Sequence, residues 1–333
     1  MLTGPSQVFP NWGPMKHVLF IAVLIIGIDQ MIGCVLSRLY LHTTTGDSGG
    51  IINGVLRRKA DFLVLGSSRA RHHVIPAILK KQLSGSVFNA GINGHDFLYA
   101  IMLLDIWTHS HAPPKAILLH IDYASLSYSE KELARTHVFS GYFGESERVR
   151  GILLMREEYE WVKYLSFSYR FNGKVLSIVK NLVMRTDNML DEYDGYVGLN
   201  GTFVARVDPV ISPAESSSDG FPPFWELKLN YLSELARYCK VNGTRLILFH
   251  SPRYQEDSAA LVDWSKRIAD LQLTHEGVEY LDLSARSAER ITGRSEYFRD
   301  VAHLNSKGAE LFSQILADEI ARRLSLEGMN GQS

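Results

Sequence analysis

Serine, histidine and aspartate side chains that could form a hydrolytic site stand far apart in this sequence. The segment "LGSSRA" places Ser67 and Ser68 directly after an apolar run, and "DVAHLN" places Asp300 and His303 near the end of the chain. A serine hydroxyl becomes a nucleophile when a base takes its proton and a carboxylate fixes and stabilises that base. The two segments therefore supply the residue types of a Ser-His-Asp triad, provided that the fold brings them together.

Short apolar runs alternate with helical patterns along most of the chain. Because continuous apolar strands between helices are typical of a parallel sheet covered on both faces, the pattern predicts an α/β fold. The expected strands are 62–65, 87–90, 116–121, 245–249 and 279–283, and the expected helices are 75–83, 96–107, 224–241, 258–271 and 306–324.

Ligands of open parallel sheets bind at the carboxyl ends of the strands, so the residues at those ends are the candidates for a site. The first four predicted strands deliver polar and glycine residues there, namely Gly66, Ser67, Ser68, Asn89, Gly91, Asn93, Gly94, His120, Asp122, His250 and Ser251. An Asp-x-x-His on a turn entering the last helix can direct its histidine back over the same edge.

In this order, the segments "LGSSRA", "NAGING" and "DVAHLN" make the region from about 61 to 324 resemble the SGNH/GDSL hydrolase superfamily. The resemblance implies a three-layer α/β/α sandwich with a mainly parallel, flavodoxin-like sheet. It also implies that Ser68 is the nucleophile, that His303 and Asp300 complete the triad, and that the N–H groups of Ser68 and Gly91 form the oxyanion hole.

The third block departs from this family pattern. The family has Gly-x-Asn, with the asparagine as an oxyanion donor, whereas "HID" places Asp122 at that position. A carboxylate would repel a developing oxyanion, and losing one donor costs about 3 kcal/mol of transition-state stabilisation. Asn93 is a substitute donor, and Asp122 could instead turn away to bind Arg69 or Arg71. Arg69 is also a candidate for binding an anionic substrate group.

Near the N-terminus, residues 18–36 are apolar except for Asp29 and Gln30, which predicts a transmembrane helix over about 17–36. A charge within a bilayer is costly, so Asp29 should be neutralised, paired with a partner protein or drawn to an interface. A cleaved signal peptide and a buried soluble helix are the alternatives, while "MIGC" matches a lipoprotein cleavage site poorly. Basic residues on both sides of the segment leave the membrane orientation open.

These observations divide the chain into an N-terminal anchor (1–42), a linker (43–60), an SGNH-like domain (61–324) and a tail (325–333). The domain contains a partly helical insertion over about 125–220. Aromatic residues in this insertion either pack it against the sheet or form a surface on which sugars stack; they are Tyr142, Phe143, Tyr159, Trp161, Tyr164, Phe167, Tyr169 and Phe171.

Composition and motifs exclude several classes of function. The 35 Lys and Arg balance 36 Asp and Glu, so no overall positive field favours nucleic acid, and two cysteines do not make a disulfide framework. Adjacent His72 and His73 point to different faces and make a poor metal site. "LGSSRA" lacks the spacing of phosphate-binding loops. We therefore expect no metal and no cofactor.

The membrane segment followed by "DFLVLGSSRA" is similar to a membrane-anchored branch of bacterial exopolysaccharide and cell-wall modification proteins. That resemblance implies an extracytoplasmic serine esterase or O-acyltransferase acting on an acylated or acceptor glycan, with a membrane acyltransferase or polysaccharide export protein as partner. The main alternative is a catalytically inactive SGNH-like module that binds glycan or scaffolds such a complex. A soluble intracellular esterase is a third possibility.

Overall fold

The computed structural model describes residues 13–44, 50–122, 125–183, 193–204, 222–255, 266, 278–281, 283, 287 and 289–330. The expected helix over 258–271 lies outside these residues, apart from Lys266.

Five parallel strands form the central sheet in the order β2-β1-β3-β4-β5. Their bounds are Phe62–Leu65 (β1), Val87–Asn89 (β2), Ala116–His120 (β3), Arg245–Phe249 (β4) and Val278–Leu281 (β5). The chain runs from β1 to β2 on one side and then returns to β3 on the other. The carboxyl end of β1 therefore lies at the switch point where open α/β sheets bind ligands.

Both faces of the sheet are buried, as the continuous apolar runs predict. Successive side chains of a strand point to opposite faces, so Leu63 and Leu65 join one core while Phe62 and Val64 join the other. The same alternation holds along β3 and β4. The predicted three-layer α/β arrangement is confirmed.

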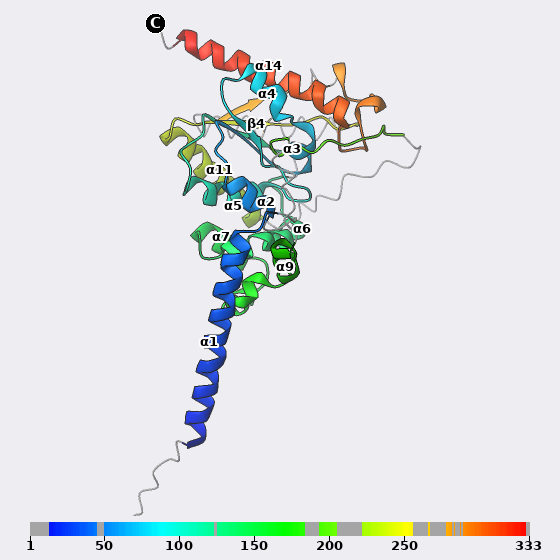
Figure 1. The fold of residues 1–333 in the computed structure, drawn as a ribbon. Coiled ribbons are helices and arrows are strands. Elements are labelled where there is room, and N and C mark those ends of the chain that lie inside the picture. Colours follow the sequence, from blue (N-terminus) through cyan, green and yellow to red (C-terminus); the bar gives the residue numbers. More distant parts are fainter. Residues whose placement is uncertain are drawn as a thin grey trace, which may run out of the picture.

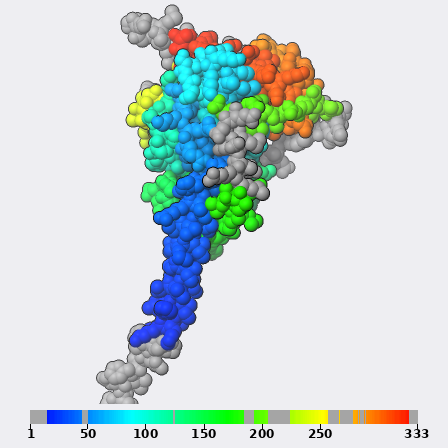
Figure 2. Space-filling view, in the orientation of Figure 1, coloured from blue at the N-terminus to red at the C-terminus, as the bar shows by residue number. Residues whose placement is uncertain are grey.

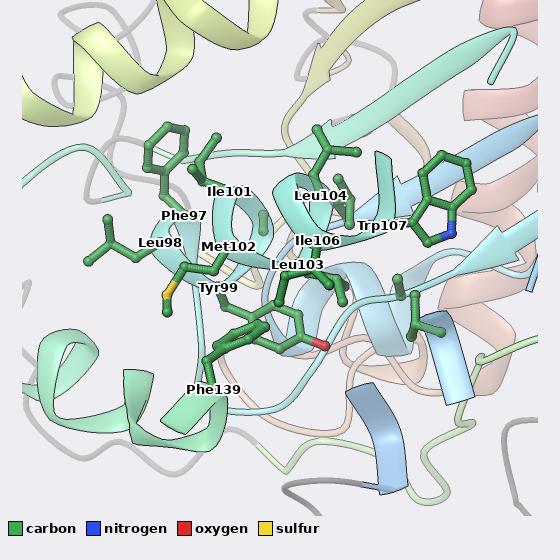
Figure 3. Packing of buried hydrophobic residues seen from close by; sticks show 14 of the residues in the cluster. Phe97, Leu98, Tyr99, Ile101, Met102, Leu103, Leu104, Ile106, Trp107 and Phe139 are labelled. Carbon is green, nitrogen blue, oxygen red and sulfur yellow. The ribbon is translucent and has the colours of Figure 1, made fainter. Parts of the chain in front are cut away.

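Helices cover the two faces as two separate layers (Figure 1). One layer contains α3 (Ser68–His73), α4 (Pro76–Gln82) and α14 (Ser306–Asn330), and α14 contacts both of the other two helices. The other contains α5 (Phe97–Thr108) and α11 (Pro222–Val241). Figure 3 shows how the apolar side chains of α5 surround that helix, with Phe139 packed beside Tyr99.

Apart from the irregular segment 193–204, the described part of the insertion is largely helical. It consists of α6 (Glu130–Arg135), the 3-10 helix η2 (Thr136–Tyr142), α7 (Glu147–Leu154), α8 (Glu160–Lys163), the 3-10 helix η3 (Ser168–Phe171) and α9 (Val175–Val183). Three of its aromatic residues, Tyr142, Tyr164 and Phe171, are buried in the same core as α5. Tyr159 and Trp161 are instead more than half exposed, at 64% and 56%.

The N-terminal helix α1 (Gly13–Leu41) is apolar and long enough to cross a membrane over Met15–Leu41, where its most apolar 18-residue window is only 6% buried. Its last turn is different, because Tyr40 is fully buried and donates a hydrogen bond to the Val138 carbonyl. The helix therefore continues into the core of the domain.

The segment 43–60, expected to be a linker, contains the short helix α2 (Ile51–Leu56). Ile52 and Val55 are fully buried, and α2 packs on α5. The Asn53 amide donates to Tyr40 and Thr43 oxygens, which ties α2 to the end of α1. The apolar residues within this Gly-rich sequence explain why it forms a helix rather than an exposed linker, because they complete the core against which α5 packs.

Candidate active site

The turn after β1 presents Ser68 at the start of α3. Gly66 has a φ of +139°, and a Cβ there would lie 2.7 Å from the His120 Cβ, so this turn requires glycine. Ser67 is the N-cap of α3, and its hydroxyl accepts from the Arg69 N–H at 3.4 Å. Ser68 is thus the first residue of the helix, where its N–H has no intrahelical partner.

A small hairpin before α14 holds Asp300 and His303. Phe298 and Leu304 form an antiparallel bridge, and the His303 carbonyl accepts from the Arg299 N–H at 2.8 Å. Within the turn, Asp300 Oδ1 accepts from the N–H groups of Ala302 and His303, both at 2.9 Å. These bonds explain why the Asp-x-x-His spacing directs both side chains to one side.

The fold brings the three predicted triad residues together. Ser68 Oγ lies 2.8 Å from His303 Nε2, and His303 Nδ1 lies 3.0 Å from both Asp300 carboxylate oxygens. The His303 side chain is 27% exposed, so the ring is only partly buried in the structure. This geometry is suited to general-base activation of a serine.

Asp300 is held as a carboxylate. Its partial burial opposes ionisation, but hydrogen bonds from the His303 side chain and from the Ala302 N–H outweigh it and hold the pKa of Asp300 at about 2. A carboxylate that stays charged across the physiological range can fix the His303 tautomer, with the Nδ1 proton toward Asp300 and Nε2 free to accept from serine.

A chain of buried hydrogen bonds holds the backbone next to His303 in place. The Leu304 N–H donates to His73 Nε2 at 2.9 Å, so the His73 proton belongs on Nδ1, 2.9 Å from Ser251 Oγ. The same hydroxyl lies 3.1 Å from His120 Nε2. Burial, reinforced by the nearby Arg69 charge, holds the pKa values of His73 and His120 well below the ordinary value for histidine. Both rings therefore act as neutral supports.

Gly91, the expected oxyanion donor, is engaged internally. Its N–H donates to Asn89 Oδ1 at 3.0 Å, and Asn89 Nδ2 in turn donates to the carbonyls of Ala70 and Val74, both at 2.8 Å. A Cβ at Gly91 would lie 2.6 Å from the backbone nitrogen of Arg71. Glycine is therefore needed at this position so that α3 can pack closely against it. The structure gives Gly91 a packing role and directs its N–H at Asn89.

Asp122 is paired with two arginines. Its carboxylate contacts the Arg69 guanidinium and lies 3.2 Å from Arg253 Nη2. Arg69 is only 4% exposed and also donates to the Ser251 carbonyl. The guanidinium is therefore used within the protein, in line with the alternative that Asp122 binds Arg69.

A buried charge network extends from Asp122 toward the insertion. Ser125 Oγ accepts from the Asp122 N–H and donates to Asp96, each at 3.0 Å. Lys228 Nζ lies 2.6 Å from Glu132 Oε2 and donates to the Ser125 carbonyl. Enclosure of the Asp96 carboxylate, together with the negative charge of Glu132, raises its pKa to about 6.

Asn93, the substitute oxyanion donor, is exposed and lies beside His72. The His72 ring lies 5.9 Å from the His303 ring, and its Nδ1 lies 2.6 Å from the Val197 carbonyl. Asn93 thus borders the triad without contacting Ser68 in the described structure.

Three polar residues have roles that the sequence reasoning did not assign. The sequence identifies Asn89 and Ser251 only as strand-end residues, whereas in the structure they tie together α3, the His303 hairpin and the neighbouring strand ends. Arg253 was not singled out. Its place four residues after the end of β4 is the available signal, because the carboxyl ends of neighbouring strands β3 and β4 share one edge of the sheet.

Within the described residues, no group of three or more His, Cys, Asp or Glu side chains is arranged to hold a metal ion.

No protein-family model and no curated protein matches the chain. Thirteen solved chains match its structure. One is described as a candidate platelet activating factor from Streptococcus pneumonia; it is 11% identical, and the match covers 92% of this chain and 98% of that chain with a TM-score of 0.38. This similarity is too low to support a conclusion about the fold or the function, so the fold is assigned from the sheet topology described above.

Proposed function

We propose that this protein is a membrane-anchored serine hydrolase or O-acyltransferase of SGNH type that acts on ester-linked acyl groups of an extracytoplasmic glycan. The observation that carries the chemical part is the Ser68–His303–Asp300 geometry, with contacts of 2.8 and 3.0 Å between residues from opposite ends of the domain. The glycan and the side of the membrane follow from the sequence resemblance.

In the first half of the reaction, Ser68 Oγ attacks the acyl carbonyl carbon while His303 Nε2 takes the hydroxyl proton. The tetrahedral intermediate then expels the alcohol of the ester, which receives that proton from His303. Asp300 stabilises the imidazolium in between. The product of this half is an acyl group bound to Ser68 Oγ.

In the second half, His303 deprotonates water or a sugar hydroxyl, which attacks the acyl carbon. The bond to Ser68 Oγ breaks, and the serine regains its proton from His303. Water gives an esterase, and a sugar hydroxyl gives a transferase. Anchoring next to a membrane partner that exports or acylates glycan favours transfer.

The oxyanion would be stabilised by the Ser68 N–H, which has no partner inside α3. Gly91 can contribute only if the Asn89 side chain releases its N–H, and Asn93 is the remaining candidate. The alternative function, a catalytically inactive glycan-binding or scaffold module, is favoured by this engagement of Gly91 and by the ion-paired Asp122.

Full-length protein in detergent, with and without Ser68→Ala, separates the two functions. The full chain is required because Tyr40, in the last turn of α1, is part of the core. Hydrolysis of p-nitrophenyl acetate or acetylated glycan, or transfer between glycans, that disappears in the variant supports the enzyme. Equal and negligible rates in both proteins, together with glycan binding, would establish the inactive module.

A further inference from the structure

The charged residue of the apolar helix has its partners within the same chain. Asp29 accepts hydrogen bonds from the Phe167 N–H at 2.7 Å, the Ser166 hydroxyl at 2.7 Å and the Ser168 hydroxyl at 2.5 Å. One turn further, a Cβ at Gly33 would overlap Phe167, so glycine allows η3 to lie directly on α1. The carboxylate that a bilayer would penalise is thus satisfied by the insertion.

The next helix, α9, exposes its apolar face. A surface helix normally turns its apolar stripe to the core, but here Ile178 is the only residue recorded as buried in α9, while an apolar set at helical spacing faces outward. Its members are Val175, Leu176, Val179, Leu182 and Val183, with Leu176 at 84% and Val183 at 76% exposure.

The segment before η3 shows the same character. Tyr159, Trp161 and Leu165 are exposed, at 64%, 56% and 69%. The charged groups between them are paired: Lys163 Nζ lies 2.9 Å from Glu160, which also binds Arg156. Tyrosine and tryptophan are enriched where proteins meet the membrane interface.

We propose that α8, η3 and α9, here called the collar, are embedded in the bilayer around the domain end of α1, with their exposed apolar side chains against lipid acyl chains. Both η3 and α9 contact α1, and Figure 2 shows the green atoms of this region beside the upper part of the blue rod. The exposed apolar surface of α1 is continuous with them, so the lipid that would cover α1 also reaches the collar. The proposal rests on the anchoring of α1 and is independent of the chemistry at Ser68.

The length of α1 places the start of η3 at membrane depth. A hydrocarbon core of about 30 Å takes about 20 helical residues. Counted from Met15, this length reaches about residue 35, just before the turn that enters the core. Asp29 and Gly33 then lie within the last 10 Å or so of hydrocarbon. The segment 166–168, which covers them, must enter the same layer, where unpaired polar groups are excluded. Asn181 of α9 accepts a hydrogen bond from the Thr44 N–H at 3.0 Å, so α9 lies nearer the end of α1, at the level of the membrane interface.

The test uses the full chain in lipid nanodiscs, with single cysteines carrying an environment-sensitive fluorophore. Cys34 is exposed on α1 and is replaced by alanine throughout, whereas Cys239 can stay, because burial raises the pKa of its thiol to about 12. Leu176→Cys probes the collar and Ile25→Cys probes α1. Val241→Cys, 78% exposed at the end of α11, is the matched control, because α11 packs on α5 and β4.

Nitroxide-labelled lipid should quench the labels at 176 and 25 by at least about twofold, and leave the label at 241 nearly unchanged. A water-soluble quencher should give the reverse. Lipid quenching at 25 but not at 176 would overturn the collar while leaving the anchor intact. Absence of lipid quenching at both positions would overturn the anchor as well. Protection of 176 from both quenchers would mean that protein covers the collar, which also contradicts the proposal.

Discussion

The two halves of the sheet's carboxyl edge differ in how their polar groups are used. On one side, Ser68, His303 and Asp300 form a partly exposed relay. On the other side, Asp122 is tied to Arg69 and leads through Ser125 into buried carboxylates. The two sides therefore differ: the Ser68–His303–Asp300 contacts are formed in this structure, whereas Gly91, one of the two expected oxyanion donors, has its N–H bound to Asn89.

The largest effect should come from the relay side. Ser68→Ala removes the nucleophile, and we expect any esterase or transferase rate to fall by at least about 10³-fold. A fluorophosphonate probe, which reacts with activated serines, should label the unmodified protein and fail to label this variant. Ser67→Ala is the control and should label normally. Labelling that persists in Ser68→Ala would place the nucleophile elsewhere.

On the other side, Asp122→Ala should act on stability. It leaves the Arg69 guanidinium, 4% exposed, without its carboxylate, and breaking a buried ion pair costs about 3–5 kcal/mol. Urea unfolding measures this loss. Arg253→Gln removes a more exposed partner of the same carboxylate and should cost clearly less. If Asp122→Ala unfolds like the unmodified protein, the arginine pairing is not structural.

The buried charges on that side should also give a pH dependence. Because the folded-state pKa of Asp96 is raised to about 6, the folded protein binds more protons than the unfolded chain between about pH 4 and 6. Stability contributed by this group therefore falls as pH rises through that window. Asp96→Asn should gain up to about 3 kcal/mol over the unmodified protein at pH 7, and little at pH 4.

Asp61→Asn is a control of opposite sign for that measurement. Hydrogen bonds from the Ser86 backbone and side chain lower the pKa of Asp61, so its contribution is present at neutral pH and is lost in acid. Asp61→Asn should therefore be less stable than the unmodified protein at pH 7, with the difference shrinking toward low pH. The same sign for both variants would contradict the assignment of Asp96.

The smallest expected effect belongs to the N-cap of α3. Ser67→Ala should cost about 1 kcal/mol of unfolding free energy, since a lost N-cap hydrogen bond typically costs that amount. Its rate should stay within a few-fold of the unmodified protein. A loss as large as that of Ser68→Ala would show that the cap itself holds the nucleophile in place.

The sheet and the positions of Ser68, Asp300 and His303 were within reach of sequence reasoning. Apolar runs report burial directly, and the ends of parallel strands must meet at one edge. The hydrogen-bond partners were not within reach. Asn89 captures the Gly91 N–H and Arg253 joins Asp122 because of side-chain directions that depend on packing between distant segments, for which a single sequence holds no periodic signal.

The segment 43–60 illustrates a different limit. Its glycines and threonines have the composition of a connection, yet the buried Ile52 and Val55 complete a core to which α5, the insertion and α11 also contribute. Asp29 is a similar case. The sequence shows a charged residue within an apolar helix, but it does not show that residues 166–168 donate hydrogen bonds to this carboxylate. Both outcomes depend on long-range contacts rather than on local propensity.

Helix α1 runs without a break into the core, where Tyr40 is fully buried, so the domain cannot move independently of the end of this helix. A domain on a flexible tether can search a volume above the membrane, whereas a domain whose core includes the end of its anchor turns with that anchor as one body. If α1 crosses a membrane as proposed, Ser68 would then be held at one distance from the lipid surface. Under the proposed function, substrate would have to be delivered to that distance from the membrane, and a supplier of glycan or acyl groups held by the same membrane would meet this requirement.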